Sequence, residues 1–594
     1  MRATATGKAP VASSPTSDID FQSDRRQEVK EYLERRYNTD GRQQVFSAGT
    51  HTTLKMKAVL KDVSRVHRVP VGMVNYITAI FGDDNMTWTD LFKLAATNKK
   101  VRDFILRYPR VIEDIRPLMG QPRSGSVHAS AIIITPKQQD GEPMECFDYT
   151  PIKKVDDLLI SELDGYSIDE VGLLKNDCLG IKELSKIQAV IDICNREYGA
   201  GLSFEGIVRS GLDDEKTFRI LSEGYTQNVF QFSSPGMTRF LQDMRPQCIG
   251  DLIAAGAFVP SGGRSIRVRR KKYLLCRREE VAPVYLWGTY DALKNTYGVL
   301  VFQEQLAQMA REVGGFSLAE GVRLLKLISK KKIDVIRAMK EKFMTGAAAK
   351  GCPKEDAEHI WEMIEAGGGY LFNASHATAY AVTSYVGAYL KANYPTAFYT
   401  VALQWADDKE IPLLMSEMEL CSKARIVPPE INTSRQVFFT DYGTDEIFWS
   451  LGRIKQLGAK AVACIVEERE KNGPYTSVEH FIHRIFRYKL KKYAYWDDPD
   501  NAEESVRVPV NARHVRNMIL AGCFDKVEGL GTVTERYGLL ARAAAELASR
   551  FRRKTSPRSW SGGTTSGAVS RLPYRASARW TTAASSRRPK PVRS

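Results

Sequence analysis

The 594-residue sequence contains no C-x-x-C pair, and its nine cysteines are scattered along the chain. Zinc ribbons and disulfide-dense domains need clustered cysteines, so neither explains this fold, and a reducing compartment is expected. No apolar run approaches the ~20 residues of a membrane-spanning helix, and the first residues lack the apolar segment of a signal peptide. We therefore expect a cytoplasmic protein that does not enter a membrane.

Acidic residues are missing from residues 551–594, which hold nine Arg and two Lys. This segment supplies +11 of the net charge of +16, so the remainder of the chain carries +5 (16 − 11). A second basic run, RSIRVRRKKYLLCRR, spans Arg264–Arg278. Positive charge favours nucleic-acid partners. Much of it lies in a tail without apolar periodicity, however, which we expect to be disordered.

The length predicts several domains. Apolar spacing predicts a helix after Arg25, short helices over about 50–118, and largely helical segments at 181–256 and 291–405. Two strands are expected, at VHASAIIITP and at VGLLKNDCLG, the latter ending at Gly180. LGRIKQLGAKAVACIVEERE has the pattern of a helix, a tight turn and a second helix. The predicted boundaries are 1–16 (disordered), 17–200, 201–425, 426–550 and 551–594.

Two short strand segments carry the residues typical of a metal site. In SDIDFQ, Asp18 and Asp20 are two residues apart, so in a strand both project from one face. Like charges this close repel unless a cation lies between them. Lys175 and Asp177 have the same spacing in LLKNDCLG. Three acids on neighbouring strands would suit Mg²⁺, and the lysine would neutralise a phosphate oxygen. Alternatively, D-x-D is a solvated turn and Asp177 a strand-end cap.

Eight sequence blocks occur in the order of a known family: SDIDFQSDRR…YLERRYN, SGSVHASAIII, VGLLKNDCLGIKELSKI, TQNVFQFSSPGM, NTYGVLVFQEQLAQMA, LISKKK, YLFNASHATAYAVTSYVGAYLKANYP and PPEINTS. From Ser17 to Val527 the chain resembles the C-family replicative DNA polymerases, the family of the bacterial DNA polymerase III alpha subunit, including phage members.

The resemblance implies an α+β fold. A partial nucleotidyltransferase-type palm would occupy 17–200, with a thumb-like helical insertion at about 25–118. A large helical fingers domain would occupy 201–425, and a helix-hairpin-helix region 426–550. The implied activity is templated addition of dNTPs to a primer 3′-end with two Mg²⁺ ions. The implied partners are primer–template DNA, dNTPs, a sliding clamp and other replisome proteins at the nucleoid.

The matching motifs assign roles to particular residues. Asp18, Asp20 and Asp177 would be the catalytic and metal-binding acids. Residues implied to bind the incoming nucleotide are Lys175, Lys326, Lys330, Lys331, Lys332, Asn373, Ser375 and His376. Residues implied to bind DNA in the hairpin that spans Gly452–Val462 are Gly452, Lys455, Gly458 and Lys460. From the residues alone, the lysine run favours a solvated helix face, His376 a cap or core position, and His128 a structural role before a buried strand.

The chain departs from the family in several places. The palm motif P-D-x-D-x-D-F places Thr16 at its first acid, and a threonine hydroxyl carries no charge. Val259 stands at the arginine of an R-P-G-P stretch. The upstream glycine-serine motif, the PHP domain and a clamp-binding peptide are not found, so we expect an N- and C-terminally incomplete member. The first fifteen residues, the 261–278 insert and the tail suggest frame-shifted reading.

Two alternatives to a polymerase follow. The chain could be a catalytically weak or inactive remnant that only binds primer–template DNA. It could also be a two-metal nuclease, since the same carboxylates serve hydrolysis.

Overall fold

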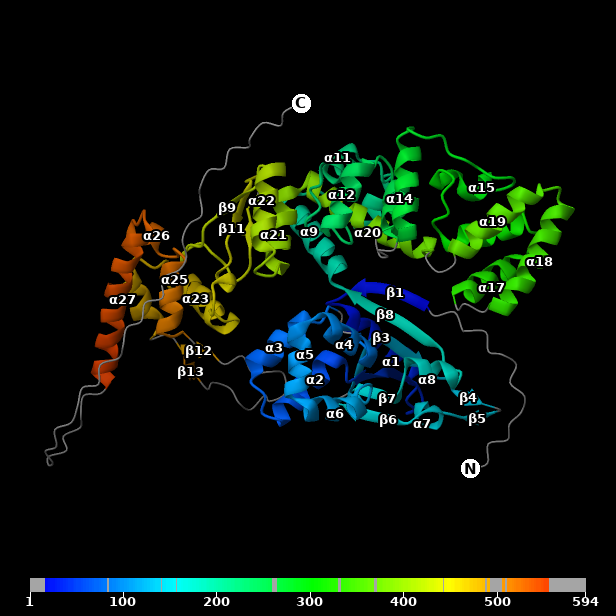
Figure 1. Cartoon of the computed structure of the whole chain (residues 1–594). Helices are drawn as coiled ribbons and strands as arrows, with labels where there is room; N and C mark the ends of the chain where they lie inside the picture. Colours follow the sequence, from blue (N-terminus) through cyan, green and yellow to red (C-terminus); the bar gives the residue numbers. More distant parts are fainter. Residues whose placement is uncertain are drawn as a thin grey trace. The chain divides into compact units, whose positions relative to one another are not determined.

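The computed structural model describes residues 17–82, 85–139, 141–155, 158–258, 264–329, 333–367, 371–441, 443–486, 489–491, 505–507 and 510–554 (Figure 1). Residues 1–16 and 555–594 of the segments expected to be disordered lie outside these ranges. The tail expected at 551–594 begins four residues too early, because residues 551–554 are the last turn of a helix. The chain divides into two compact units. The first comprises residues 1–429 and 433–453, and the second comprises residues 430–432 and 454–594.

The first unit begins with a mixed six-stranded sheet in the order β1-β8-β3-β2-β7-β6. Strand β1 pairs parallel with β8, and β2 pairs parallel with β7, while the other neighbours are antiparallel. The strands are β1 (Ser17–Gln22), β2 (Val45–Thr53), β3 (Pro122–Ile134), β6 (Ile152–Val155), β7 (Leu158–Asp164) and β8 (Lys175–Ile181).

Both predicted strands are present in this sheet. The strand expected at VHASAIIITP is the second half of β3, and the strand expected at VGLLKNDCLG begins only at Lys175. The preceding residues instead follow the short helix α8 (Gly165–Glu170). The remaining small elements are β4 (Gln138–Gln139), β5 (Glu142–Pro143) and α7 (Cys146–Tyr149).

Helix α1 (Arg26–Tyr37) follows β1 and packs on one face of the sheet, where Leu33 contacts the cluster formed by Val45, Ile132 and Cys178. Of the apolar positions at helical spacing that predicted the helix, Val29 and Leu33 are half-buried, whereas Tyr32 and Tyr37 are exposed. Arg26 Nε donates to the Cys178 carbonyl at 2.7 Å. The helix therefore ties the turn after β1 to β8.

A group of five helices lies between β2 and β3 and has its own apolar core, which includes Val59, Ile77, Phe104 and Ile115. Within the predicted insertion at about 25–118, β2 belongs to the central sheet: its first five residues are buried, and it pairs with β3 and β7. The insertion proper consists of α2 (Met56–Val66), α3 (Val71–Ile80), α4 (Trp88–Thr97), α5 (Lys99–Arg107) and α6 (Pro109–Leu118).

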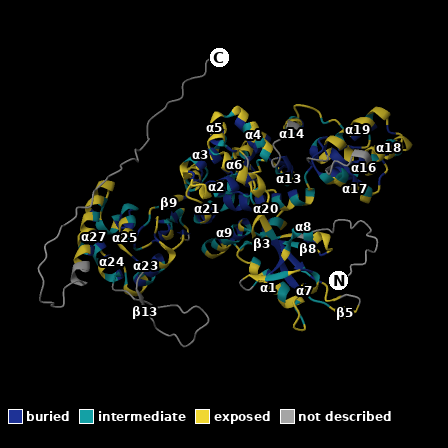
Figure 2. Cartoon of the chain, turned by 60° about the horizontal axis from the view of Figure 1, so that its bottom comes forward, coloured by how far each residue is buried: buried dark blue, intermediate teal, exposed yellow. Residues whose placement is uncertain are grey.

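Figure 2 shows buried residues at the centre of the sheet, in the first half of β2 and the second half of β3, whereas the helices expose one side. This pattern is expected for helices with an apolar stripe packed on a core.

The segment after β8 is helical, as predicted, and forms two apolar cores. One surrounds α20 and includes Phe240, Tyr385 and Tyr399; the other surrounds Phe343 and Trp361. The helices are α9 (Lys182–Tyr198), α10 (Phe204–Arg209), α11 (Glu215–Glu223), α12 (Pro235–Met244), α13 (Ile249–Phe258), α14 (Arg264–Arg277), α15 (Tyr290–Leu293), α16 (Gln303–Glu312), α17 (Leu318–Ser329), α18 (Ile333–Ala349), α19 (Lys354–Gly367), α20 (Ala374–Asn393), α21 (Pro395–Trp405) and α22 (Ile411–Cys421), with the 3₁₀ helix η1 (Lys294–Thr296).

Helix α14 covers most of residues 261–278, the segment whose composition suggested frame-shifted reading. The contacts of this helix argue against that hypothesis. Tyr273 is buried against Phe258 and Tyr297, and Cys276 is also buried. Arg277 makes two hydrogen bonds of 3.0 Å with the buried carboxylate of Asp251. A segment read in a wrong frame would not be expected to supply both a fitting aromatic ring and a paired cation. The described part of this segment is therefore an integral helix.

A small sheet closes the first unit, and the second unit is helical. The sheet contains β9 (Arg425–Val427), β10 (Phe439–Thr440) and β11 (Glu446–Phe448), followed by the 3₁₀ helix η2 (Leu451–Arg453). The second unit packs around Val462, Phe481, Ile519 and Phe524. Its elements are α23 (Ala459–Asn472), α24 (Val478–Ile485), β12 (Lys489–Lys491), β13 (Ser505–Arg507), α25 (Ala512–Leu520), α26 (Asp525–Glu528) and α27 (Val533–Lys554).

The predicted helix–turn–helix at Leu451–Glu470 is partly wrong. Its first element is the single turn η2, and only the second is an α-helix. Gln456, with φ +66°, leaves the right-handed region before a longer helix could form.

In the described residues, no helix is both long and apolar enough to cross a membrane.

A buried ion pair joins α20 to α22. Lys391 and Glu417 are in direct contact and almost fully buried. Lys391 also donates to the Gln227 carbonyl at 2.8 Å, and the Tyr399 hydroxyl donates to Glu417 at 3.0 Å. Burial lowers the pKa of Lys391, and the neighbouring Glu417 opposes that shift. The Glu417 carboxylate is therefore the charge that stabilises the buried ammonium group of Lys391.

Glu417→Gln should destabilise the first unit by ~3–5 kcal/mol, because it removes the charge that compensates a buried ammonium while keeping the side-chain shape. The deficit should shrink as the pH rises, since a neutral amine costs less to bury. Urea unfolding followed by circular dichroism measures the change.

The matched control is Glu358→Gln, which breaks the exposed Lys354–Glu358 pair and should cost less than ~1 kcal/mol. Equal unfolding midpoints for the two variants would contradict the assignment.

Candidate active site

The pairing of β1 with β8 brings the predicted acids onto neighbouring strands. Asp18 lies directly opposite Asp177, and Asp20 lies opposite Leu179. Neighbouring strands are ~4.8 Å apart and paired residues share a face, so the backbone places Asp18, Asp20 and Asp177 on one side of the sheet. The side chain of Asp18 lies outside the described part of the chain. Asp20 is half-buried.

Asp177 is held by two side chains. Its Oδ1 accepts a hydrogen bond of 2.9 Å from the Ser130 hydroxyl, and its Oδ2 lies 3.1 Å from Lys175 Nζ. The ion pair confirms that Lys175 and Asp177 project from the same face. Asp177 is 18% exposed. The carboxylate is therefore oriented but still reachable from solvent.

Ser130 is turned toward Asp177 by an irregularity in β3. The register with β2 shifts between Ser47, opposite Ile132, and Gly49, opposite Val127. His128 Nδ1 lies in this irregular stretch and accepts from the backbone N–H groups of Ser130 and Ala131, at 3.2 and 3.0 Å. His128 is thus structural, as its position before a buried strand indicated.

The sequence reasoning missed Ser130. A small hydroxyl residue within the block HASAIII was the available signal, but only the shifted register directs it to Asp177.

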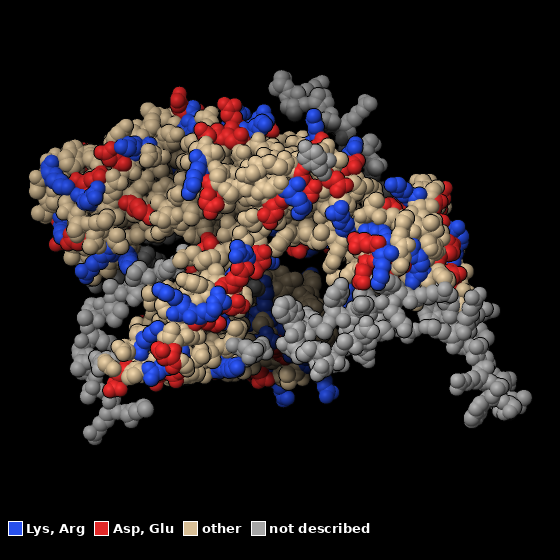
Figure 3. All heavy atoms as spheres, turned by 180° about the vertical axis from the view of Figure 1, so that it is seen from behind, with Lys and Arg blue, Asp and Glu red and all other residues tan. Residues whose placement is uncertain are grey.

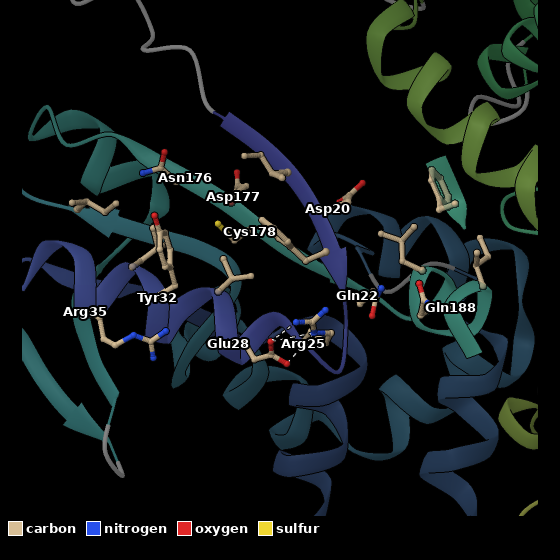
Figure 4. A pocket seen from close by; sticks show the side chains of 18 of the residues that line it. Asp20, Gln22, Arg25, Glu28, Tyr32, Arg35, Asn176, Asp177, Cys178 and Gln188 are labelled. Atoms are coloured by element: carbon tan, nitrogen blue, oxygen red, sulfur yellow. Dashed lines mark hydrogen bonds and ion pairs between the residues drawn. The ribbon is translucent and has the colours of Figure 1, made fainter. Parts of the chain in front are cut away.

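A cavity of about 970 Å³ lies beside these acids, among β1, β8, α1 and α9 (Figure 4). Asp20, Asn176 and Asp177 contribute to its lining, and the Arg25–Glu28 ion pair, at 2.7 Å, lies along it. The thiol of Cys178 faces away from the acids, into the small apolar cluster under α1. Burial raises the pKa of this thiol, so it is neutral near pH 7. The volume is that of a small-ligand site.

The sequence did not reveal this cavity, because its wall requires α1 to lie across a strand that is distant in the chain.

The nucleotide-binding candidates of the helical part are described only in part. Lys326 is exposed on α17, whereas Lys330, Lys331 and Lys332 lie outside the described residues. Asn373 caps α20, and its side chain accepts a hydrogen bond of 2.8 Å from the His376 N–H. Ser375, in the first turn of α20, is exposed.

The ring of His376 belongs to an aromatic group. Its centroid lies 4.0 Å from that of Tyr380 and 5.5 Å from that of Phe372. The three rings line a cavity of about 340 Å³ with Gln231 and Phe232. His376 is therefore a half-buried member of a cavity wall, and Asn373 is the helix cap.

The hairpin candidates surround the start of α23. Gly452 lies in η2, where a Cβ would come within 2.5 Å of the Gln436 carbonyl oxygen. Gly458 is the N-cap of α23 and gives its first turn no side-chain cap. Lys455 and Lys460 are exposed on either side of it. The uncapped N–H groups and two lysines suit an anion.

Within the described ranges, no group of three or more His, Cys, Asp or Glu side chains has the arrangement of a metal site.

His128→Ala should speed amide hydrogen exchange at Ser130 and Ala131, because both N–H groups lose their acceptor. The loss should destabilise the sheet by ~1–3 kcal/mol. Exchange measured by mass spectrometry tests this, and His128→Asn, which restores an acceptor on a short side chain, is the matched variant. Unchanged exchange in His128→Ala would show that the ring does not support the β3 irregularity.

Three families match segments of the chain. Residues 11–180 match the bacterial DNA polymerase III alpha NTPase domain, residues 183–351 match the bacterial DNA polymerase III alpha subunit finger domain, and residues 423–495 match a helix-hairpin-helix motif.

Curated relatives carry the name DNA polymerase III subunit alpha. The protein of Treponema pallidum is 34% identical over 521 residues, which cover 86% of this chain and 41% of the relative. That of Borreliella burgdorferi is 35% identical over 537 residues (87% and 42%), and that of Aquifex aeolicus is 31% identical over 507 residues (81% and 42%). The chain thus spans about two fifths of the length of these relatives.

Proposed function

The chain belongs to the family of bacterial DNA polymerase III alpha subunits, and on that premise we propose that it is the core of a DNA-templated DNA polymerase in replication. It would add dNTPs to the 3′-end of a primer paired with a template. The observation that carries the proposal is the parallel register that sets Asp18 opposite Asp177, with Asp20 two residues further along β1.

The donor set fits divalent magnesium. Carboxylate oxygens are the ligands Mg²⁺ prefers, and Asp18, Asp20 and Asp177 would hold two such ions. Ions held by these three acids would supply charge that activates a primer hydroxyl and stabilises the departing pyrophosphate. Ser130 would orient the Asp177 carboxylate, and Lys175 would exchange its ion pair for a phosphate oxygen of the nucleotide.

The nucleotide would be held mainly by charge and position, since phosphoryl transfer needs little covalent chemistry from the protein. Lysines meet a polyanion without strict geometry. We assign triphosphate contacts to the two helical segments that carry Lys326, Lys330–Lys332 and the Asn373–His376 block.

The hairpin would bind duplex DNA without reading its sequence. The match to a helix-hairpin-helix motif and the exposed, uncapped start of α23 support this assignment. Backbone N–H groups and lysines bind phosphates, which carry no sequence information. Gly452, Lys455, Gly458 and Lys460 are the assigned residues. A sliding clamp and other replisome proteins are further proposed partners, at the nucleoid.

One sequence feature favours a second candidate function. Thr16 stands where the family has the first acid of its palm motif, so one negative charge is missing from the metal site. A chain with little or no catalysis that still binds primer–template DNA is therefore the alternative. The nuclease alternative has no such support, because its hydrolysis would not use the lysine-rich segments.

Asp177→Ala should reduce primer extension by ~10²–10³-fold or more, the usual loss when one preorganised charged group is removed from an active site. Affinity for the primer–template should be unchanged. Extension of a labelled primer with Mg²⁺ and four dNTPs measures the first, and a mobility shift the second.

Asp169→Asn, at an exposed position on α8, is the control and should extend primers normally. If wild-type protein binds the duplex but never extends it, the DNA-binding alternative holds. Retained extension in Asp177→Ala would contradict the metal assignment.

The double variant Lys455→Ala/Lys460→Ala should weaken duplex binding equally for two unrelated DNA sequences, because both lysines would contact phosphates. Competition mobility shifts with the two duplexes measure this. A change in preference between the sequences would refute a backbone-only role.

A further inference from the structure

Helix α25 lies beyond the residues 423–495 that match the hairpin motif, and its exposed face is basic. We propose that α25 extends the DNA-binding surface of the hairpin, with Arg513 and Arg516 contacting backbone phosphates. This inference rests on the proposed DNA binding of the chain.

Two contacts join α25 to the hairpin loop. Asn517 Nδ2 donates to the Lys455 carbonyl at 2.6 Å. The His514 ring interacts with the backbone of Gln456, the residue at φ +66° in the turn. The loop and the helix are therefore parts of one surface within the second unit, and Lys455 is placed beside α25 by its own backbone.

The spacing of residues along α25 places Arg513 and Arg516 on the exposed side of the helix. Val515, Met518 and Ile519 are buried, and His514 and Asn517 face the loop. At 100° per residue, Arg513 lies next to Asn517 around the helix, and Arg516 lies one step further from the loop. Arg513 and Arg516 thus lie on the exposed side of the helix that contacts the loop carrying Lys455.

Two sets of cations in the second unit differ in their partners. The first set stabilises the fold: Arg484 binds the buried Glu468 at 2.8 Å, Arg536 binds Asp525, and Arg542 binds Glu528. The second set is exposed and makes no ion pair with another described residue: Lys455, Lys460, Arg513 and Arg516.

Exposed cations on the hairpin and α25 without carboxylate partners among the described residues point to a polyanionic partner. Exposed surfaces elsewhere mix the two signs, as the face drawn in Figure 3 shows for Lys and Arg among Asp and Glu. Arg513 and Arg516, three positions apart on α25, repel each other in the free protein, and a phosphate backbone would relieve that repulsion. The pKa of His514 is lowered, first by burial and then by the charge of Arg513. His514 therefore stays neutral near pH 7, and the charge comes from the arginines.

The test measures binding of a fluorescent primer–template duplex by anisotropy at several NaCl concentrations, with the full chain. Loss of two phosphate contacts should reduce the slope of log K against log salt by about 1.8, at ~0.9 per contact. Arg513→Ala/Arg516→Ala should show this reduction, and Arg513→Lys/Arg516→Lys should keep the wild-type slope.

Lys471→Ala/Lys526→Ala removes two other exposed cations of the second unit and is the matched control; its slope should equal that of the wild type. Thermal melting checks folding, and Arg513→Gln/Arg516→Gln replaces the alanine pair if that pair unfolds.

A wild-type slope in the neutral variants, with the wild type binding DNA, would overturn the inference. So would neutral variants that lose binding to polyglutamate but not to the duplex, since the surface would then recognise acidic protein. Failure of the wild type to bind the duplex at all would instead overturn the proposed function.

Discussion

The parallel pairing of β1 with β8 is the constraint on which the candidate active site depends. These strands are far apart in the chain, and their register is held at the turn after β1. Arg26 Nε reaches the Cys178 carbonyl across 152 residues of sequence, and the Ser23 N–H donates to the Ser185 hydroxyl at 2.9 Å. A shift by one residue would turn the carboxylate of Asp18 to the opposite face from that of Asp177.

Charge has two distinct uses in this chain. Where a cation is buried it has a carboxylate partner, as for Lys391 with Glu417 on α20 and α22 and for Arg277 with Asp251. Such pairs are costly to break, because the remaining charge would stay out of water. At the hairpin and α25 the cations are instead exposed, which leaves their charge available to a ligand. Asp177 combines the two cases, because Lys175 forms an ion pair with it and is still 21% exposed to solvent.

The sequence reasoning was most accurate where local periodicity decides structure. The alternation of Asp18 and Asp20 predicted the strand, and the apolar spacing predicted α1 and the helices that follow β8. It was wrong about the hairpin's first element, which is the single turn η2 (Leu451–Arg453) rather than an α-helix. The frame-shift hypothesis for residues 261–278 came from the run of arginines and lysines in α14. In the structure this run forms a helix whose Tyr273 and Cys276 side chains are buried.

By itself the sequence determined the family and the type of most elements, because each depends on residue order and short-range spacing; its acids and lysines stay predicted site residues. Only the tertiary structure decided which residues meet. The Ser130 hydroxyl reaches Asp177 through an irregularity in a third strand. The cavity beside the acids is lined by α1, β1 and β8, and α25 joins the hairpin loop through Asn517 and His514. Such contacts depend on chain segments whose separation in sequence carries no signal of their proximity in space.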